Sequence, residues 1–255
     1  MLTAVSRLIS ESSRPNCRLM HMPFQARGID MGEKSYKNRG DYVFDTLKKE
    51  ILDLELKPGQ AISENEICSR FDVSRTPVRE ALRRLQEQGF VNTIPYSGTY
   101  VTLLNLTNIK QMIYMRVAVE LMVMRDFMKI ETPLLLEEIR HHIRCQELLI
   151  QEPGFEPEQF YRMDAQMHAI WFTATDKEKL WEFIQAQQLH YTRFRMLDFV
   201  TETDFTRIIK EHTQLFELLE QKNEQALEEV LKKHLYISMT RMKNAIEVEY
   251  KDYFE

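Results

Sequence analysis

The sequence is poor in glycine, proline and cysteine. Seven glycines and eight prolines in 255 residues are too few for a turn-rich protein, so we expect a mainly helical chain with short connections. Three cysteines, odd in number and widely spaced, are not the pattern of a disulfide-stapled secreted domain, which indicates a cytosolic protein. No apolar run reaches the roughly 18 residues that a membrane span needs. The length and an apolar content of 44% predict two packed domains.

The net charge of −5 is distributed unevenly along the chain. Residues 36–103 carry ten basic and ten acidic side chains, whereas residues 104–255 carry 19 basic and 26 acidic ones. The acidity therefore lies in the C-terminal part. A local basic patch in the neutral middle segment is still compatible with binding to nucleic acid, because groove binding depends on local charge.

Such a patch lies in residues 74–85, SRTPVREALRRL. Four apolar residues recur there at a helical period and predict a buried stripe: Val78, Ala81, Leu82 and Leu85. Three arginines recur at every fourth position on a neighbouring face: Arg75, Arg79 and Arg83. Arginine forms bidentate contacts with guanine and with phosphate, so this helix is expected to bind DNA. A surface helix with solvated arginines is the alternative.

The flanking sequence predicts a winged helix-turn-helix around this helix. Residues 42–56 have the pattern of an amphipathic helix, and Ser63 and Glu66 can form a capping box that opens a short second helix. Two β-prone runs, residues 90–94 and 99–103, follow the arginine helix and are joined by a turn. This order is typical of DNA-binding winged helices, although a unit of three helices and a hairpin without a ligand would look the same.

Residues 1–35 show no sustained period. We expect a disordered tail, or an extension from an upstream start codon with Met31 as the true start, and a transit peptide is the remaining alternative. The predicted division of the chain is a tail at 1–35, a winged-helix domain at 36–103, a linker at 104–108 and an all-α domain at 109–255.

The last of these parts has a helical period almost throughout, which predicts a helical bundle. The expected helices are residues 109–130, 133–151, 157–175, 178–200, 204–221 and 223–249.

Four polar residues of this bundle have the spacing of a metal site. Asp164 and His168 are at i and i+4 on one helix. His212 and His234 are 22 residues apart around a break at residues 222–223. An antiparallel helix pair would therefore place them side by side at the same height along the helix axes. One carboxylate and three imidazoles suit a divalent transition metal, zinc first, with nickel or manganese possible. Taken singly, each histidine is more often a packed or surface residue.

The N-terminal motifs resemble those of GntR-family bacterial transcriptional regulators. The resemblance covers residues 42–103 without a gap and includes SENEI at 63–67, VSRTPVREALRRL at 73–85 and SGTYV at 97–101. It implies that Arg75 and Arg79 read base edges, that Thr76 contacts the DNA backbone and that Gly98 lets the wing approach the minor groove. Several members have an arginine at the position of Asn65, which alters one contact. The predicted DNA-binding residues are Ser74, Arg75, Thr76, Arg79, Arg83, Asn65 and Gly98.

The C-terminal pattern resembles the FCD effector domain of the FadR subfamily. The resemblance implies that Asp164, His168, His212 and His234 bind a metal whose coordination a small carboxylate effector completes. Arg116 has two possible roles, an ion pair with Glu120 at i+4 or a pair with an effector carboxylate. Arg195 is a weaker candidate for the second role.

These interpretations together predict a cytoplasmic, homodimeric, sequence-specific transcriptional regulator. We expect a repressor whose partners are a double-stranded DNA operator, a second copy of the chain and a small organic acid. Two alternatives remain, a metal-dependent hydrolase-like enzyme and a helical domain that the metal only stabilises. The enzyme is disfavoured because no carboxylate stands out as the general base that a metal-activated water would need.

Overall fold

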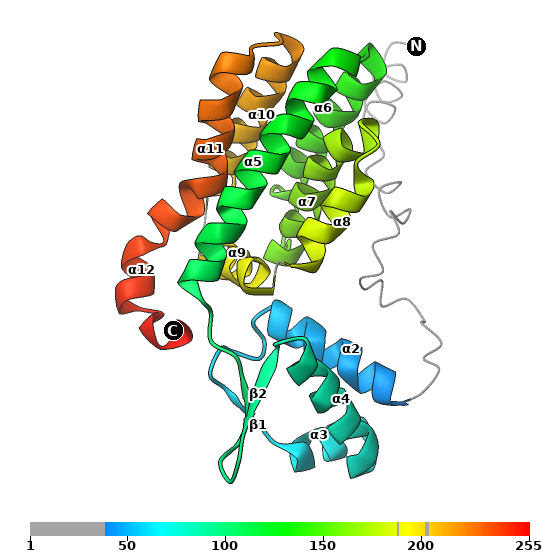
Figure 1. Ribbon diagram of the computed structural model, residues 1–255, viewed down its shortest axis with the longest axis vertical. Coiled ribbons are helices and arrows are strands. Elements are labelled where there is room, and N and C mark those ends of the chain that lie inside the picture. The colour runs from blue at the N-terminus through cyan, green and yellow to red at the C-terminus, as the bar shows by residue number, and fades with distance from the viewer. Residues whose placement is uncertain (1–38, 188, 202–203) are drawn as a thin grey trace, which may run out of the picture.

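The computed structural model describes residues 39–187, 189–201 and 204–255. The predictions for residues 1–35 therefore lie outside the described part. A small domain with a three-stranded sheet lies at one end of a larger helical bundle (Figure 1). The predicted mainly helical class is confirmed. Among the described helices, none combines the length and apolar composition that crossing a membrane requires.

The small domain contains three helices and a short antiparallel sheet. The helices are α2 (Arg39–Leu52), α3 (Glu64–Phe71) and α4 (Arg75–Glu87), and the strands are β1 (Ala61–Ile62), β2 (Val91–Ile94) and β3 (Gly98–Val101). The strand order is β1-β3-β2, with Val91 opposite Val101 and Ile94 opposite Gly98. Strand β1 was not predicted, because two residues are too short to show an alternating pattern.

Helix α4 buries the stripe that its sequence predicts. Val78, Ala81, Leu82 and Leu85 are all buried, and they share one hydrophobic cluster with Val43, Leu47 and Ile51 of α2. The helix ends before Gly89, whose φ of +77° is a left-handed conformation that favours glycine. The opposite, polar face of α4 is left exposed to solvent.

The bundle contains seven helices of nine or more residues, followed by a short α12. Their bounds are α5 (Leu106–Ile130), α6 (Pro133–Leu149), α7 (Pro157–Ala174), α8 (Glu178–Ala186), α9 (Leu189–Thr201), α10 (Thr206–Glu220), α11 (Glu224–Arg241) and α12 (Lys243–Val248). The single helix expected at 178–200 is in fact α8 and α9, and the one expected at 223–249 is α11 and α12. The sequence of each segment keeps a helical period throughout, so the period does not reveal where one helix ends and the next begins.

Helix α9 lies between the bundle and the small domain (Figure 1). Its first residue, Leu189, packs against the hydrophobic cluster of the small domain, and Arg193 is fully buried. The Arg193 guanidinium donates to the carbonyl oxygen of Thr102 at 2.7 Å and to the hydroxyl of Thr102 at 3.2 Å. Helix α9 therefore holds the segment at which the chain passes from one domain to the other.

The C-terminal residues hold the same segment by backbone hydrogen bonds. Leu104 donates to the carbonyl oxygen of Tyr253 at 2.8 Å, and its own carbonyl accepts from the amide of Glu255 at 3.0 Å. The amide of Asn105 donates to Nδ1 of His190 at 3.3 Å. The connection between the domains is therefore an extended segment with its polar groups bonded, not a free tether.

Candidate DNA-binding surface and metal site

The predicted DNA-binding residues all lie on exposed surface of the small domain. Ser74, Arg75 and Thr76 lie at the start of α4, and Arg79 lies one turn further. Ser74 occupies the N-cap position in an extended conformation, but its side chain makes no capping hydrogen bond. The hydroxyl of Ser74 is therefore not used inside the helix. A helix N-terminus that is exposed in this way suits an anion, because its first N–H groups have no partner within the helix.

The arginines of α4 differ in what holds them. Nε of Arg79 donates to both carboxylate oxygens of Glu64, at 3.0 and 3.3 Å, and Nη2 of Arg75 donates to Oδ1 of Asn65 at 3.2 Å. Arg83 instead pairs with Glu80 and Glu87 of its own helix.

Arg84 has a different role from these three, because it faces α2. Its guanidinium lies 4.0 Å from the centre of the Phe44 ring and pairs with Asp41 at 2.8 Å. We therefore assign Arg84 to the packing of the small domain.

The wing is the hairpin of β2 and β3, residues 91–101, which has no charged side chain. Its tip presents Tyr96 completely exposed, with a φ of +63°. Gly98 follows with a φ of +143°, which favours glycine over any residue with a side chain. Contacts from this wing to DNA would therefore use hydroxyl, aromatic and backbone groups rather than cations.

The four predicted metal ligands lie together in the bundle. Asp164 and His168 come from α7, His212 from α10 and His234 from α11. One ligand atom from each residue can be chosen so that all four lie within 4.8 Å of one another. All four residues are buried. The structure thus brings together every residue that the spacing selected.

Each histidine of this site is oriented by an oxygen from another residue. Nδ1 of His168 lies 2.6 Å from Oε2 of Glu120, Nδ1 of His212 lies 2.7 Å from Oε1 of Gln146, and Nδ1 of His234 lies 2.9 Å from Oε2 of Glu211. Since Nδ1 donates in all three rings, Nε2 is left as the ligand atom. Oriented imidazoles with an oxygen acceptor behind them are the usual surroundings of metal-bound histidine.

Two atoms at the centre of the cluster lack hydrogen-bond partners. Oδ1 of Asp164 and Nε2 of His212 are buried, and neither has a hydrogen bond within the described residues. They lie 3.2 Å apart, but their orientation is not that of a hydrogen bond. Nε2 of His168 and Nε2 of His234 are 3.3 Å apart. Buried polar atoms that converge without pairing are costly, and a cation between them would satisfy them. The residues therefore fit a metal ion.

The electrostatics favour the protonation states that a metal requires. Burial lowers the pKa of His212 to about 4 and also lowers the pKa of His234. Burial alone would raise the pKa of Asp164, but His212, His168 and Arg195 hold it well below its usual range. Neutral imidazoles and an ionised carboxylate are the ligand forms at neutral pH.

The buried ion pair of Arg116 and Glu120 adjoins this site. Nε of Arg116 donates to Oε1 of Glu120 at 2.6 Å, and Nη1 donates to the hydroxyl of Tyr191 at 2.6 Å. Burial alone would raise the pKa of Glu120, but the charge of Arg116 and the contact with His168 lower it to about 2. Of the two roles that the sequence left open for Arg116, the structure has the ion pair.

Arg195 is placed differently. Nη1 of Arg195 lies 3.3 Å from Oδ2 of Asp198 and also donates to the hydroxyl of Ser238. Nη2 of Arg195 lies 3.9 Å from Oδ1 of Asp164. One end of this guanidinium is thus anchored, while the other faces the predicted metal ligands.

Sequence reasoning missed the residues that orient the histidines. Glu211 orients His234 but directly precedes His212 in the sequence. Its position next to a predicted ligand could therefore have identified it. Gln146 lies on α6, where no motif marks it, and Glu120 was considered only as a partner of Arg116.

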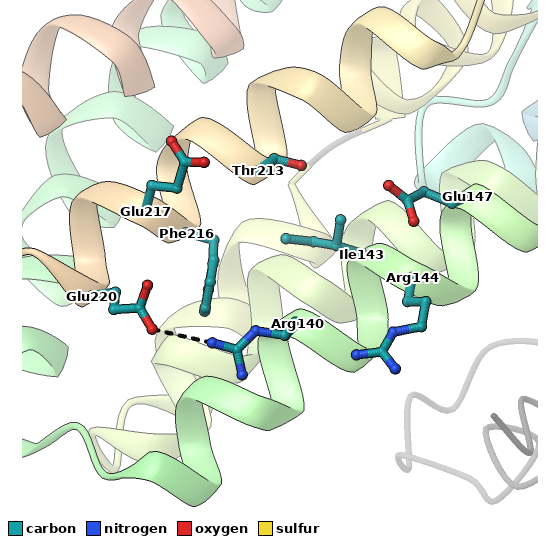
Figure 2. Close-up of a pocket in the computed structure, with 8 residues that line it drawn as sticks. All are labelled: Arg140, Ile143, Arg144, Glu147, Thr213, Phe216, Glu217 and Glu220. Atoms are coloured by element: carbon teal, nitrogen blue, oxygen red, sulfur yellow. Dashed lines mark hydrogen bonds and ion pairs between the residues drawn. The ribbon is translucent and has the colours of Figure 1, made fainter. Parts of the chain in front are cut away.

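A surface groove between α6 and α10 is separate from the metal site. Ile143 and Phe216 line it, and Arg140 bridges to Glu220 at 3.1 Å across it (Figure 2). None of its lining residues belongs to the cluster of Asp164, His168, His212 and His234.

Comparison with known proteins finds a matching family for each of the two parts of the chain. A family described as bacterial regulatory proteins, gntR family, matches residues 40–101, and the FCD domain family matches residues 111–236. The chain is 25% identical over 193 residues to the HTH-type transcriptional repressor RspR of Escherichia coli K12, which covers 76% of this chain and 84% of RspR. It is 45% identical over 60 residues to the mannosyl-D-glycerate system repressor MngR of the same organism, covering 23% of this chain and 25% of MngR.

Solved structures share the fold. McbR/YncC of E. coli superposes with a TM-score of 0.62 at 18% identity, covering 81% of this chain and 98% of that one. Lar, which controls expression of the agr system in Listeria monocytogenes, superposes with a TM-score of 0.54 at 17% identity, covering 83% and 99%.

Proposed function

The chain belongs to the GntR family of bacterial transcriptional regulators, in the group with a C-terminal FCD domain, and from this premise we propose that it is a homodimeric repressor whose affinity for its operator is set by a small carboxylate bound at a metal. A regulator of this family binds DNA through its winged helix and is not an enzyme. The finer parts of the proposal are the residues, the metal, the effector and the direction of control. The names of RspR and MngR as repressors support repression.

The DNA-contacting part of the proposal assigns base readout to Arg75 and Arg79 and backbone contacts to Ser74, Thr76 and Arg83. The exposure of these residues supports this assignment, as does the position of all of them except Arg83 in the first two turns of α4. An arginine with free terminal nitrogens can form two hydrogen bonds to O6 and N7 of guanine. Gly98 would bring the uncharged wing close to the neighbouring groove.

The effector-binding part of the proposal assigns a divalent metal, zinc first, to the cluster of Asp164, His168, His212 and His234. The ion would supply a Lewis-acidic position at which a carboxylate group binds. Arg195 would pair with the same effector, because its Nη2 faces the cluster while Nη1 is anchored. Arg116 is fully engaged with Glu120 and Tyr191, so its role would be to orient His168.

The observation that carries the proposal is that α9 contacts both the candidate metal site and the small domain that carries the DNA-binding surface. One face of α9 presents Leu189 and Arg193 to the small domain and its linker. The other presents Tyr191 and Arg195 to Arg116 and Asp164. A ligand that moves Arg195 therefore changes the position of Arg193, which holds the linker carbonyls. Coupling between two binding sites is typically worth about 1–3 kcal/mol.

A second copy of the chain is the proposed partner at the exposed apolar residues of α5 and α8. Tyr114 and Met122 of α5 and Phe183 of α8 are each more than half exposed. The two helices are neighbours, because Lys177 beside α8 contacts Asp126 of α5 at 3.1 Å. A two-fold dimer through this face would present two α4 helices to an inverted repeat.

The dimer is tested by replacing Met122 with glutamate and measuring mass by light scattering. We expect the wild type to be a dimer and M122E a monomer with much weaker operator binding. V248E, which alters a more exposed apolar residue on α12, is the control and should remain dimeric. A dimer that survives both M122E and F183E would contradict this interface.

The effector is tested by fluorescence anisotropy on a DNA sequence selected from a random library with the zinc-loaded protein. A panel of small mono-, di- and hydroxy-carboxylates is added, and about 5–150-fold changes in affinity are expected for the right acid. R195A should abolish the response while keeping the metal and the basal affinity, and R140A, on the surface groove, should respond normally. An unchanged response in R195A would remove Arg195 from the effector site. No response in any protein to any acid would favour a metal that only stabilises the fold.

A further inference from the structure

The first turn of α3 faces the first turns of α4, and two side chains bridge the gap. Glu64 and Asn65 are the first two residues of α3, and each accepts hydrogen bonds from one arginine of α4. Glu64 accepts from Nε of Arg79 with both oxygens, and Asn65 accepts from Nη2 of Arg75. We propose that Glu64 is a positioning residue that orients the Arg79 guanidinium group for base readout and does not itself contact DNA.

This inference rests on the proposed readout of bases by Arg79.

The local sequence explains why these residues meet. Ser63 caps α3 by accepting from the amide of Glu66 at 3.4 Å, which sets the start of the helix. Asp72 adopts a left-handed conformation, with φ of 49° and ψ of 54°, and turns the chain sharply into α4. The short turn places the beginnings of both helices close together. Glu64 and Arg79 are thus neighbours although they are 15 residues apart in the sequence.

The atoms used by Glu64 are the ones that guanine recognition does not need. A guanidinium carries five N–H groups, one on Nε and four on the terminal nitrogens. Glu64 engages Nε, and the terminal nitrogens of Arg79 make no hydrogen bond to any described residue. Bidentate recognition of guanine O6 and N7 can use those terminal groups. The carboxylate therefore holds the side chain while leaving its recognition edge free.

Holding the arginine in advance favours specific binding over loose association. A free arginine loses much side-chain freedom when it is fixed against a base, and a pre-oriented one loses less on binding. The negative charge of Glu64 also repels nearby phosphates, which weakens contacts in which Arg79 is not seated on a base. Glu64 would thus raise the discrimination between base pairs and lower the affinity for random DNA.

Arg83 provides the internal contrast. It is held by Glu80 and Glu87, which lie on the same helix three and four residues away. These carboxylates engage Nε and both terminal nitrogens of Arg83, so each of its three nitrogens is already bonded within the helix. Glu87 is therefore a matched control, since its removal also takes a carboxylate away from an α4 arginine.

The test compares full-length wild type, E64A, E64Q and E87A by fluorescence anisotropy. The probes are the consensus duplex selected with the wild type, its single-base-pair substitutions and a random-sequence duplex of equal length. R79A first identifies the base pair that Arg79 reads.

We expect E64A to bind random DNA about threefold more tightly, because a negative charge is lost, and to lose about fivefold of its discrimination at the Arg79 base pair alone. E64Q keeps an acceptor oxygen and should recover most of that discrimination. E87A should tighten binding to all duplexes by a similar factor.

Equal changes of E64A on every duplex would overturn the inference, because Glu64 would then act only as a surface charge. Loss of discrimination at a base pair other than the one that R79A identifies would also overturn it. If R79A itself shows no position-dependent effect, the readout assigned under the proposed function fails instead.

Discussion

The two functional regions of this chain are opposite in their physical construction. The DNA-binding surface is exposed, and its arginines are held by carboxylate and amide groups that water can reach. The metal site is buried, and each of its histidines is held by an oxygen at 2.6–2.9 Å. Exposed ion pairs in high dielectric are worth little, whereas unpaired buried polar groups cost a great deal. The bundle should therefore depend on its metal for stability, and the small domain should not depend on its arginines.

This contrast also separates the two kinds of specificity. In the proposed function, specificity at the surface would come from the hydrogen-bond donors that remain free to reach a base. In the bundle, it would come from how completely a bound ion satisfies the donors and acceptors around it. Helix α9 is the element that connects the two, because it is packed on the metal site and bonded to the linker.

The largest expected effect is loss of the metal. H212A should reduce the bound metal, measured by mass spectrometry, from about one ion per chain to nearly none. Metal removal from the wild type should lower the melting temperature of the bundle by on the order of 10 °C, as for a ligand present at about a thousand times its Kd. H142A, on a histidine outside the cluster, should keep its metal. If H212A retains its metal and its melting temperature, the cluster is not a metal site.

A smaller effect on metal binding is expected when a residue that orients a histidine ligand is replaced. Q146L leaves Nδ1 of His212 without its acceptor, so metal affinity should fall about 10–100-fold. The measurement is a competition with a coloured chelator. Q146E keeps an acceptor oxygen and should bind metal nearly as well as the wild type. Equal affinities for Q146L and the wild type would show that the orientation of His212 does not depend on this bond.

Substitutions on the DNA-binding surface should change DNA binding without changing the stability of the protein. R79A should lose about 1–3 kcal/mol of discrimination at one base pair, while its melting temperature stays close to that of the wild type. R83A should weaken binding to all sequences alike and reduce the magnitude of the salt slope by about one. The measurement is anisotropy at several salt concentrations. A position-specific effect in R83A would contradict its assignment to phosphate.

The smallest effect is expected at a half-buried contact between the domains. Lys49 of α2 lies 3.2 Å from Glu158 of α7, and both side chains are about one quarter exposed. K49M should destabilise the protein by less than about 1 kcal/mol, measured by denaturant unfolding. A larger loss would mean that this ion pair, and not only α9 and the linker, fixes the relative position of the domains.

Much of the small domain was predictable because its signals are local. The apolar stripe of α4 and its exposed arginines both lie within residues 74–85, and their spacing along one helix decides which face is buried. The clustering of the four candidate metal ligands was predictable for a related reason. Asp164 and His168 are one turn apart on one helix, and a single reversal brings His212 and His234 level.

The residues that complete the metal site were not predictable in this way. Glu120 meets His168 across 48 residues, and Gln146 meets His212 across 66. Such contacts depend on how α5 and α6 are rotated against α7 and α10, and a helical period records only which face is apolar. The break between α8 and α9 was missed for the same reason, since both segments have helical sequences.

The amino-acid sequence by itself therefore determined the mainly helical class, the arginine face of α4 and the four residues that cluster in the bundle, because short-range spacing decides these. Only the tertiary structure decided which oxygens orient the histidines, that Arg116 is used inside the bundle, and that Arg193 of α9 holds the linker. Those contacts join elements that are far apart in the chain, and their geometry comes from the packing of whole helices rather than from the preferences of single residues.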